Sequence, residues 1–324
     1  MAYTKKSNRK RWLITAGISA AVIIVFGVFW ALTAGRDVSV LNPQGHIASR
    51  QRDLILFTVM LSVIVVVPVF TMLGVFAWKY REGNTSADYT PDVDGNTWLE
   101  MLWWGIPIAI IGILSVVTWT TTHELEPSRQ LASTEPPLKV QVIALQWKWL
   151  FIYPDQQIAS LNELRIPAGT PVNFELTADA PMSAFWIPSL GSQVYAMTGM
   201  SSKLNLIADK PGTYRGTNSN INGEGYADMN FEVIAMANRK EFDHWANAVE
   251  KYKDHTNLDW KRYQELAKQS RNDNSRYYHV HDAGLYTKVV NTYAHGSKNA
   301  ADSTDRPVVE QHNGVEHHNG EEYH

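Results

Sequence analysis

The chain has 324 residues, of which 45% are hydrophobic and 19% are charged, and its formal net charge is −3. It contains no cysteine, which excludes disulfides, thiol catalysis, iron–sulfur clusters and any copper centre that requires thiolate ligands. The near-neutral charge provides no basic field for binding nucleic acid.

Three stretches of the chain contain neither a charged residue nor a histidine: residues 12–35, 54–78 and 101–122. Each is longer than the ~18 apolar residues that indicate a membrane-spanning helix. A purely soluble protein is therefore excluded.

Residues 1–35 allow two interpretations. Residues 5–11 carry five positive charges directly before the first apolar stretch, which predicts by the positive-inside rule that the N-terminus stays in the cytoplasm. A signal peptide also has a cationic start, but its apolar stretch is ~7–15 residues long, which is shorter than this one. A signal peptide and an uncleaved first transmembrane helix both remain open, and the length favours the helix.

Residues 36–122 are predicted to form a two-helix transmembrane hairpin, with residues 79–97 in the cytoplasm and the chain after residue 123 outside. Three arginines in residues 36–53 count against this orientation, because the cytoplasmic loop has only two cations. Tryptophan favours membrane–water interfaces. The residues expected to fix the hairpin at the interfaces or against a partner are Trp78, Trp98, Trp103, Trp104 and Trp119.

Residues 123–237 have the pattern of short β-strands. Apolar and polar residues alternate at residues 139–142, 172–176, 203–206 and 230–233, and turns rich in proline, glycine and asparagine separate these segments. The spacing predicts an all-β sandwich or barrel outside the membrane.

Residues 238–295 return to a helical spacing and contain nine aromatic residues. These rings could be core residues that hold the helices on the β-domain, which is the favoured interpretation, or a surface that binds a partner. Residues 296–324 are predicted to be a disordered polar tail. The tail histidines could bind a divalent metal, but simple solvation is favoured; they are His312, His317, His318 and His324.

Three blocks in the β-region resemble subunit II of the haem–copper respiratory oxidases. They are LQWKWLFIYP at residues 145–154, FWIPSLGSQVYAM at residues 185–197 and PGTYRG at residues 211–216. The resemblance implies a cupredoxin-like β-sandwich that is carried on two transmembrane helices and bound to subunit I. The family's quinol-oxidising members of the cytochrome bo type often have a lipobox cysteine after the N-terminal apolar stretch, where this chain has Gly35 and Arg36.

The copper-bearing branch of that family has a histidine before the second block and a C-x-x-x-C-x-x-x-H-x-x-M run after the third. Ser183 stands at the first histidine position, and Thr217, Ile221 and Gly225 stand at the cysteine, cysteine and second histidine positions. Met229 falls one residue late. Because such a centre needs thiolate and imidazole ligands, we expect no copper and no metal site in this domain.

The loss of these ligands is what a resemblance to the quinol-oxidising branch implies, and the blocks are closest to subunit 2 of cytochrome bo-type ubiquinol oxidases. The resemblance implies a proton-pumping terminal oxidase of the bacterial inner membrane, with this multi-pass chain carrying its C-terminal domain in the periplasm. The chain would hold no cofactor and no catalytic centre, since the haems and copper would lie in subunit I, which receives ubiquinol. Expected partners are subunits I, III and IV and the lipid bilayer, without cytochrome c or nucleic acid. The alternative is a membrane-tethered cupredoxin-like scaffold or assembly protein.

Glu100 lies at the edge of the third apolar stretch, on the side predicted to be cytoplasmic. A carboxylate so close to hydrocarbon is costly unless it is partnered or hydrated, which makes it a functional candidate. An acid near a helix N-terminus also gains ~0.3–1 kcal/mol from the helix dipole. This interaction alone would be enough to explain an acidic residue at this position. The resemblance favours the functional role, because it implies a subunit II glutamate at the mouth of one proton channel.

Overall fold

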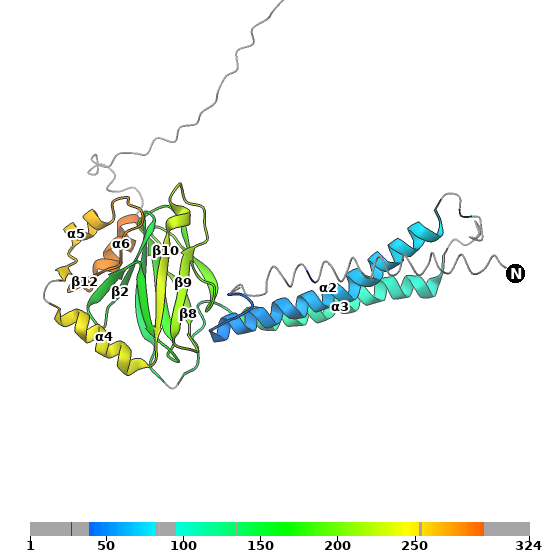
Figure 1. Cartoon of the computed structure of the whole chain (residues 1–324), viewed down its shortest axis with the longest axis horizontal. Coiled ribbons are helices and arrows are strands. Elements are labelled where there is room, and N and C mark those ends of the chain that lie inside the picture. Colours follow the sequence, from blue (N-terminus) through cyan, green and yellow to red (C-terminus); the bar gives the residue numbers. More distant parts are fainter. Residues whose placement is uncertain are drawn as a thin grey trace, which may run out of the picture.

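The computed structural model describes residues 39–81, 84, 95–133, 135–252 and 255–294, together with Gly27. The expectations for residues 1–35, apart from Gly27, and for the tail at 296–324 lie outside these residues. Within the described part, a long helical hairpin projects from a β-sandwich, and the last helices lie on the side of the sandwich away from the hairpin (Figure 1).

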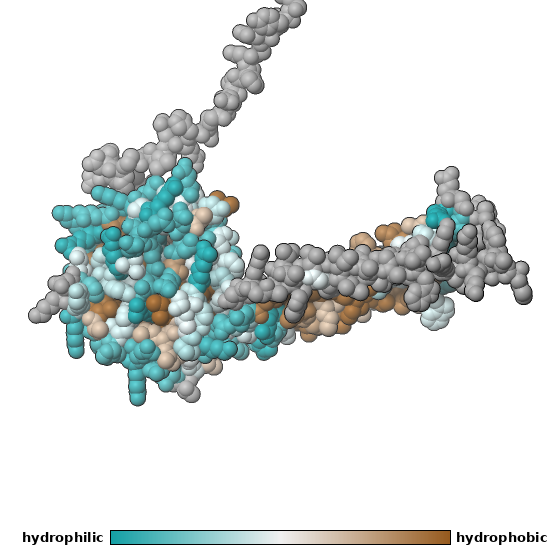
Figure 2. All heavy atoms as spheres, viewed as in Figure 1, coloured by the Kyte–Doolittle hydropathy of each residue, from teal (hydrophilic) through white to brown (hydrophobic). Residues whose placement is uncertain are grey.

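The hairpin consists of α2 (His46–Lys79) and α3 (Thr97–Glu124), which both extend from the sandwich in the same direction (Figure 1). Both helices are long and apolar enough to cross a membrane, and the most apolar 18-residue window of each contains no buried residue. Figure 2 shows the contrast between the hydrophobic hairpin and the hydrophilic surface of the sandwich. Because an exposed apolar surface of this size is unfavourable in water, the hairpin needs lipid or other helices around it.

Local features explain where the two helices begin and why they continue. Pro68 lies inside α2 and Pro107 inside α3, and neither ends its helix, as membrane helices tolerate proline. The side chain of Asn96 caps α3 by accepting hydrogen bonds from the backbone N–H groups of Trp98 and Leu99 at 3.0 and 3.2 Å. No side chain caps α2, whose first turn is held by the sandwich instead.

The sandwich is built from two sheets. The strand order is β11-β12-β3-β2-β1-β5-β8 in the larger sheet and β4-β10-β9-β6-β7 in the smaller one. The pairs β1–β5, β4–β10 and β11–β12 are parallel, and the other pairs are antiparallel. The first ten strands are β1 (Leu138–Leu145), β2 (Lys148–Tyr153), β3 (Ile158–Leu161), β4 (Glu163–Pro167), β5 (Val172–Ala178), β6 (Ser183–Ile187), β7 (Gly191–Ala196), β8 (Ser202–Leu206), β9 (Gly212–Asn218) and β10 (Asn230–Met236).

The tryptophan-rich strand β2 is buried on both faces. Trp149 belongs to the main core, where its ring makes an edge contact with Phe185 at 5.3 Å and Phe185 stacks on Phe231 at 5.1 Å. Leu150 and Ile152 belong to a second core that includes residues of the C-terminal helices. Since successive side chains of a strand point to opposite faces, a strand covered on both sides is apolar throughout.

The segment after β10 combines helices with strands, although we expected helices alone. The strand β12 pairs antiparallel with β3 and so extends the larger sheet, whose edge would otherwise expose unpaired backbone groups. The elements are α4 (Arg239–Lys251), β11 (Thr256–Asn257), α5 (Trp260–Leu266), β12 (Arg276–His279) and α6 (Leu285–Ala294).

Several aromatic residues of this segment are core residues. Phe242, Tyr263 and Tyr286 are at most 4% exposed, whereas Tyr252 is 54% exposed. Tyrosine hydroxyls of the segment also bond to polar groups of the sandwich, and burial raises the pKa of Tyr277 and of Tyr286 to about 12. The bonded pairs are Tyr263–Asp179, Tyr293–Asp179, Tyr277–Glu163 and Tyr286–Ser201.

The hairpin meets the sandwich at the start of α2. Ile47 and Ala48 are the buried residues of this helix, at 6% and 5% exposure. The N–H of Gln44 donates to the carbonyl of Ser189 at 2.8 Å, and the N–H of Ala48 donates to the carbonyl of Leu190 at 3.2 Å. The second of the three sequence blocks therefore holds the first turn of the membrane helix.

Candidate functional site

The start of β6 and the loop between β9 and β10 meet at a small polar cluster. Ser183 is fully buried; its hydroxyl accepts a hydrogen bond from Asn222 Nδ2 at 2.9 Å and donates to the carbonyl of Pro181 at 3.2 Å. The sulfur of Met229 lies 4.0 Å from Ser183 Oγ and 3.9 Å from Asn222 Nδ2. The cluster includes Ser183, which the resemblance in the sequence assigned to the position of a copper-ligating histidine.

The indole of Trp147 packs against the same loop. Its Nε1 donates to the carbonyl of Asn222 at 3.2 Å, and a Cβ atom at Gly225 would lie only 2.3 Å from the ring. The guanidinium of Arg271 lies 4.5 Å from the ring centroid and pairs with Glu224 at 2.7 Å. Trp147 is therefore 6% exposed, between the loop and the C-terminal segment.

The four positions assigned to copper ligands from the sequence are not brought together. Only Ser183 lies in the polar cluster. The Thr217 hydroxyl donates to the carbonyl of Asn218 at 3.3 Å, Ile221 is 76% exposed, and Gly225 has no space for a side chain beneath Trp147.

A register one residue later than the one expected from the sequence places more of its positions at the polar cluster. Counting the ligand spacing back from Met229 gives Tyr226, Asn222 and Asn218. Asn222 lies in the cluster, and Asn218 Oδ1 accepts a hydrogen bond from the N–H of Ala184, next to Ser183, at 2.8 Å. Anchoring the run on Met229 removes the one-residue mismatch that the other register leaves at this methionine.

Neither register supplies ligands that fit a dinuclear copper centre. The side chains in reach are a hydroxyl, amides and a thioether, whereas this chemistry needs thiolates and imidazoles. Within the described ranges, no group of three or more histidine, cysteine, aspartate or glutamate side chains is arranged to hold a metal ion.

Lys148, the neighbour of Trp147, links the tryptophan strand to the C-terminal segment. Its ammonium group donates to the carbonyl of Lys268 at 2.8 Å and to the hydroxyl of Ser270, and it lies 3.5 Å from a carboxylate oxygen of Asp273. Burial lowers the pKa of Lys148, while the charge of Asp273 opposes that shift.

Glu100 lies in the first turn of α3, at the end of the hairpin that is far from the sandwich (Figure 1). Its backbone N–H donates to the carbonyl of Asn96 at 2.9 Å, and its side chain is exposed. It is the acidic residue of the first turn, whereas Glu124 ends the helix on the opposite side.

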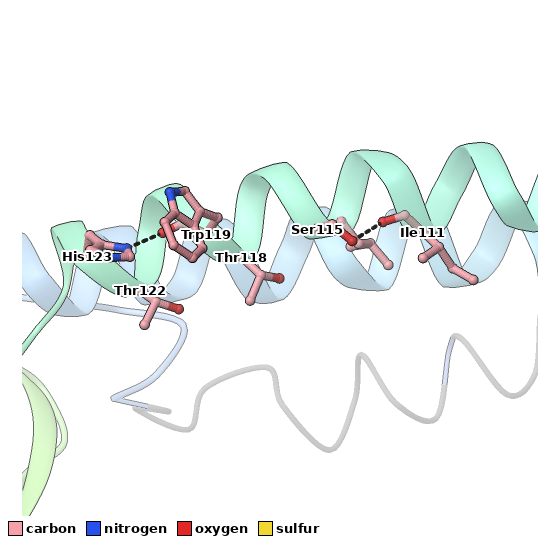
Figure 3. Close-up of a pocket in the computed structure, with 7 residues that line it drawn as sticks. Ile111, Ser115, Thr118, Trp119, Thr122 and His123 are labelled. Carbon is pink, nitrogen blue, oxygen red and sulfur yellow. Dashed lines mark hydrogen bonds between the residues drawn. The ribbon is translucent and has the colours of Figure 1, made fainter.

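The tryptophans expected at interfaces are all exposed on the hairpin, and they lie near its two ends. Near the sandwich, the rings of Trp119 and His123 lie 4.7 Å apart, and Thr118 and Thr122 project from the same helix beside them (Figure 3). These residues border a groove of about 460 Å³ on α3. The exposed fractions are 38% for Trp78, 80% for Trp98, 57% for Trp103, 67% for Trp104 and 71% for Trp119.

Comparisons with known proteins identify the family of the chain. Residues 156–236 match the family described as cytochrome c oxidase subunit II, periplasmic domain, and residues 253–297 match the COX aromatic-rich motif. The chain is 41% identical over 264 residues to cytochrome bo(3) ubiquinol oxidase subunit 2 of Pseudomonas aeruginosa, across 82% of this chain and 79% of that protein. It is 41% identical over 268 residues to ubiquinol oxidase subunit 2 of Acetobacter aceti, across 82% and 86%. The chain belongs to the ubiquinol oxidase subunit 2 family.

A solved structure is also similar: the periplasmic domain of subunit II of the Bradyrhizobium japonicum cytochrome oxidase, with 24% identity and a TM-score of 0.33, over 34% of this chain and 91% of that one. As a family member, the chain is a subunit of a respiratory ubiquinol oxidase, with subunit I as a partner. The part of the chain that the structure describes contains two candidate membrane helices and a periplasmic β-sandwich.

A periplasmic sandwich fixes the direction of both helices of this oxidase subunit. His46 and Glu124 lie at the periplasmic ends of α2 and α3, so Lys79 and Thr97 lie at the opposite ends. Two of the three arginines that counted against this orientation are paired with carboxylates: Arg50 with Glu124 at 2.9 Å and Arg52 with Asp53 at 2.8 Å.

Proposed function

We propose that the chain is a copper-free subunit II of a proton-pumping terminal oxidase in the bacterial inner membrane, and that ubiquinol passes its electrons directly to subunit I. The observation that carries the proposal is the polar cluster of Ser183, Asn222 and Met229. Side chains of this kind offer no metal relay for electrons. The haems and copper then belong to subunit I, and cytochrome c has no electron-accepting site on this chain.

Elemental analysis of the purified chain tests the absence of copper. We expect no stoichiometric copper and no thiolate-to-copper absorption, because the chain has no cysteine. Stoichiometric copper that survives dialysis against a chelator would contradict the proposal.

The hairpin supports subunit I in this proposal, and subunits III and IV complete the complex. The support is the apolar surface of α2 and α3, which is exposed on the isolated chain. Deletion of residues 54–120 is expected to release the sandwich from the membrane and to abolish ubiquinol oxidase activity. An unrelated transmembrane hairpin of the same length is the matched control, since it restores the membrane anchor alone. Full activity with that replacement would reduce the role of the hairpin to anchoring.

Glu100 is proposed to line a proton entrance to subunit I. Two observations support this role: its carboxylate is exposed on the hairpin, and it lies at the end of α3 opposite the periplasmic sandwich. An acid at that position can collect protons from the cytoplasm at the edge of the hydrocarbon.

A further inference from the structure

The loop between β9 and β10 is fastened to the start of β6 by three asparagines that alternate in sequence. Asn218 Oδ1 accepts from the N–H of Ala184 at 2.8 Å, Asn220 Nδ2 donates to the carbonyl of Met182 at 2.8 Å, and Asn222 Nδ2 donates to Ser183 Oγ at 2.9 Å. Each of the three consecutive residues 182–184 is therefore hydrogen-bonded to the side chain of one of these asparagines.

Ordinary turn chemistry does not explain these bonds. Asparagine is common in turns because its side chain bonds to backbone groups two residues away. Asn218 does make such a bond, to the N–H of Asn220 at 3.1 Å. The contacts to residues 182–184 instead span 34 to 39 positions in the sequence, so they join two separate segments of the fold.

The other side of the loop is fixed by packing. Gly223 has a φ of 108°, a conformation that favours glycine, and its Cβ position is 3.2 Å from the Trp147 ring. Trp147 itself has a φ of 64° and bonds to the carbonyl of Asn222. At the end of the loop, the indole of Trp149 donates to the carbonyl of Met229 at 3.4 Å.

We propose that Asn218, Asn220 and Asn222 form an asparagine latch that holds the β9–β10 loop on β6, in the structural role that a metal and its ligands would have between the same two segments. The inference rests on the proposed copper-free function. It adds that the loop reaches its final shape without any metal-loading step, so that this domain folds independently of copper supply.

Hydrogen exchange on the full-length chain tests the latch. The variants Asn222→Leu and Asn218→Leu keep approximate volume but remove the hydrogen bonds. Each is expected to speed exchange of the amides in residues 218–229 by roughly 5- to 30-fold, the effect of losing about 1–2 kcal/mol locally. Ile221→Ser is the matched control, because Ile221 lies between two latch residues and is 76% exposed. It should exchange like the wild type.

Two further measurements separate the possible failures. Amides of β1 and β2 report global folding, so unchanged protection there assigns any effect to the loop. Wild-type loop exchange should be the same with added copper and with a chelator. Wild-type exchange in both leucine variants would overturn the latch while leaving the copper-free function intact. Stoichiometric copper binding would overturn the proposed function, and copper-dependent loop protection would overturn both.

Discussion

Gly191 provides the space that Ile47 occupies where the membrane hairpin meets the periplasmic sandwich. A Cβ atom on Gly191 would lie 2.7 Å from Ile47 Cγ2, which is closer than real contacts allow. Gly191 also has a φ of 141°, a backbone conformation that other residues rarely adopt. Gly191, which belongs to the second sequence block, therefore allows the membrane hairpin to pack closely against the sandwich.

Gly191→Ala is expected to destabilise the chain by about 1–3 kcal/mol, because it adds a steric clash to backbone strain. Thermal unfolding of the purified chain measures this loss, and the haem content of membranes reports assembly with subunit I. Gly169→Ala is the matched control, since Gly169 has a φ of 72° but open space around its Cβ position. Equal losses in the two variants would show that strain alone, and not the contact with Ile47, makes Gly191 necessary.

The register of the lost copper run can be tested by restoring ligands. The test variant combines Ser183→His, Asn218→Cys, Asn222→Cys and Tyr226→His. Its new ligands follow the spacing that ends at Met229. We expect this variant to bind copper and to acquire thiolate-to-copper absorption.

The control keeps Ser183→His and places the other three ligands one position earlier, as Thr217→Cys, Ile221→Cys and Gly225→His. It should bind no stoichiometric copper, because Ile221 faces solvent and a side chain at position 225 would collide with Trp147. Copper binding by the control alone would restore the register expected from the sequence.

Sequence patterns predicted the elements more reliably than the contacts between them. Apolar length identified both described membrane helices, and alternation identified strands such as β5 and β10. The pairing of β12 with β3 was missed, because a strand of four residues among helices is too short to show a recognisable alternation of apolar and polar residues. The contact between Asn222 and Ser183 was missed too, since hydrogen bonds between residues 39 positions apart leave no local pattern.

Alkaline pH is expected to loosen the C-terminal segment from the sandwich. The pKa values of Tyr277 and Tyr286 are raised from 10.0 to about 12, mainly by burial, so the folded chain holds these protons more tightly than the unfolded chain. Their contribution to stability is fully present below pH 10 and is lost as the pH rises through about 12. Denaturant unfolding across this range measures the loss. Tyr277→Phe and Tyr286→Phe should each make the free energy of unfolding fall less steeply with pH. An unchanged pH dependence in both variants would refute the assignment of the loss to these two tyrosines.

Proton uptake by the oxidase is expected to depend on Glu100. Glu100→Gln keeps the size of the side chain but removes its charge and its ability to carry a proton. If the carboxylate feeds a channel of subunit I, ubiquinol oxidation and proton uptake should slow several-fold while haem content stays the same. Glu124→Gln is the matched control at the periplasmic end of the same helix. It breaks only a surface ion pair with Arg50, which is worth ~0–1 kcal/mol, and it should leave turnover unchanged. Wild-type turnover and proton uptake in Glu100→Gln would leave Glu100 with the favourable helix-dipole interaction alone.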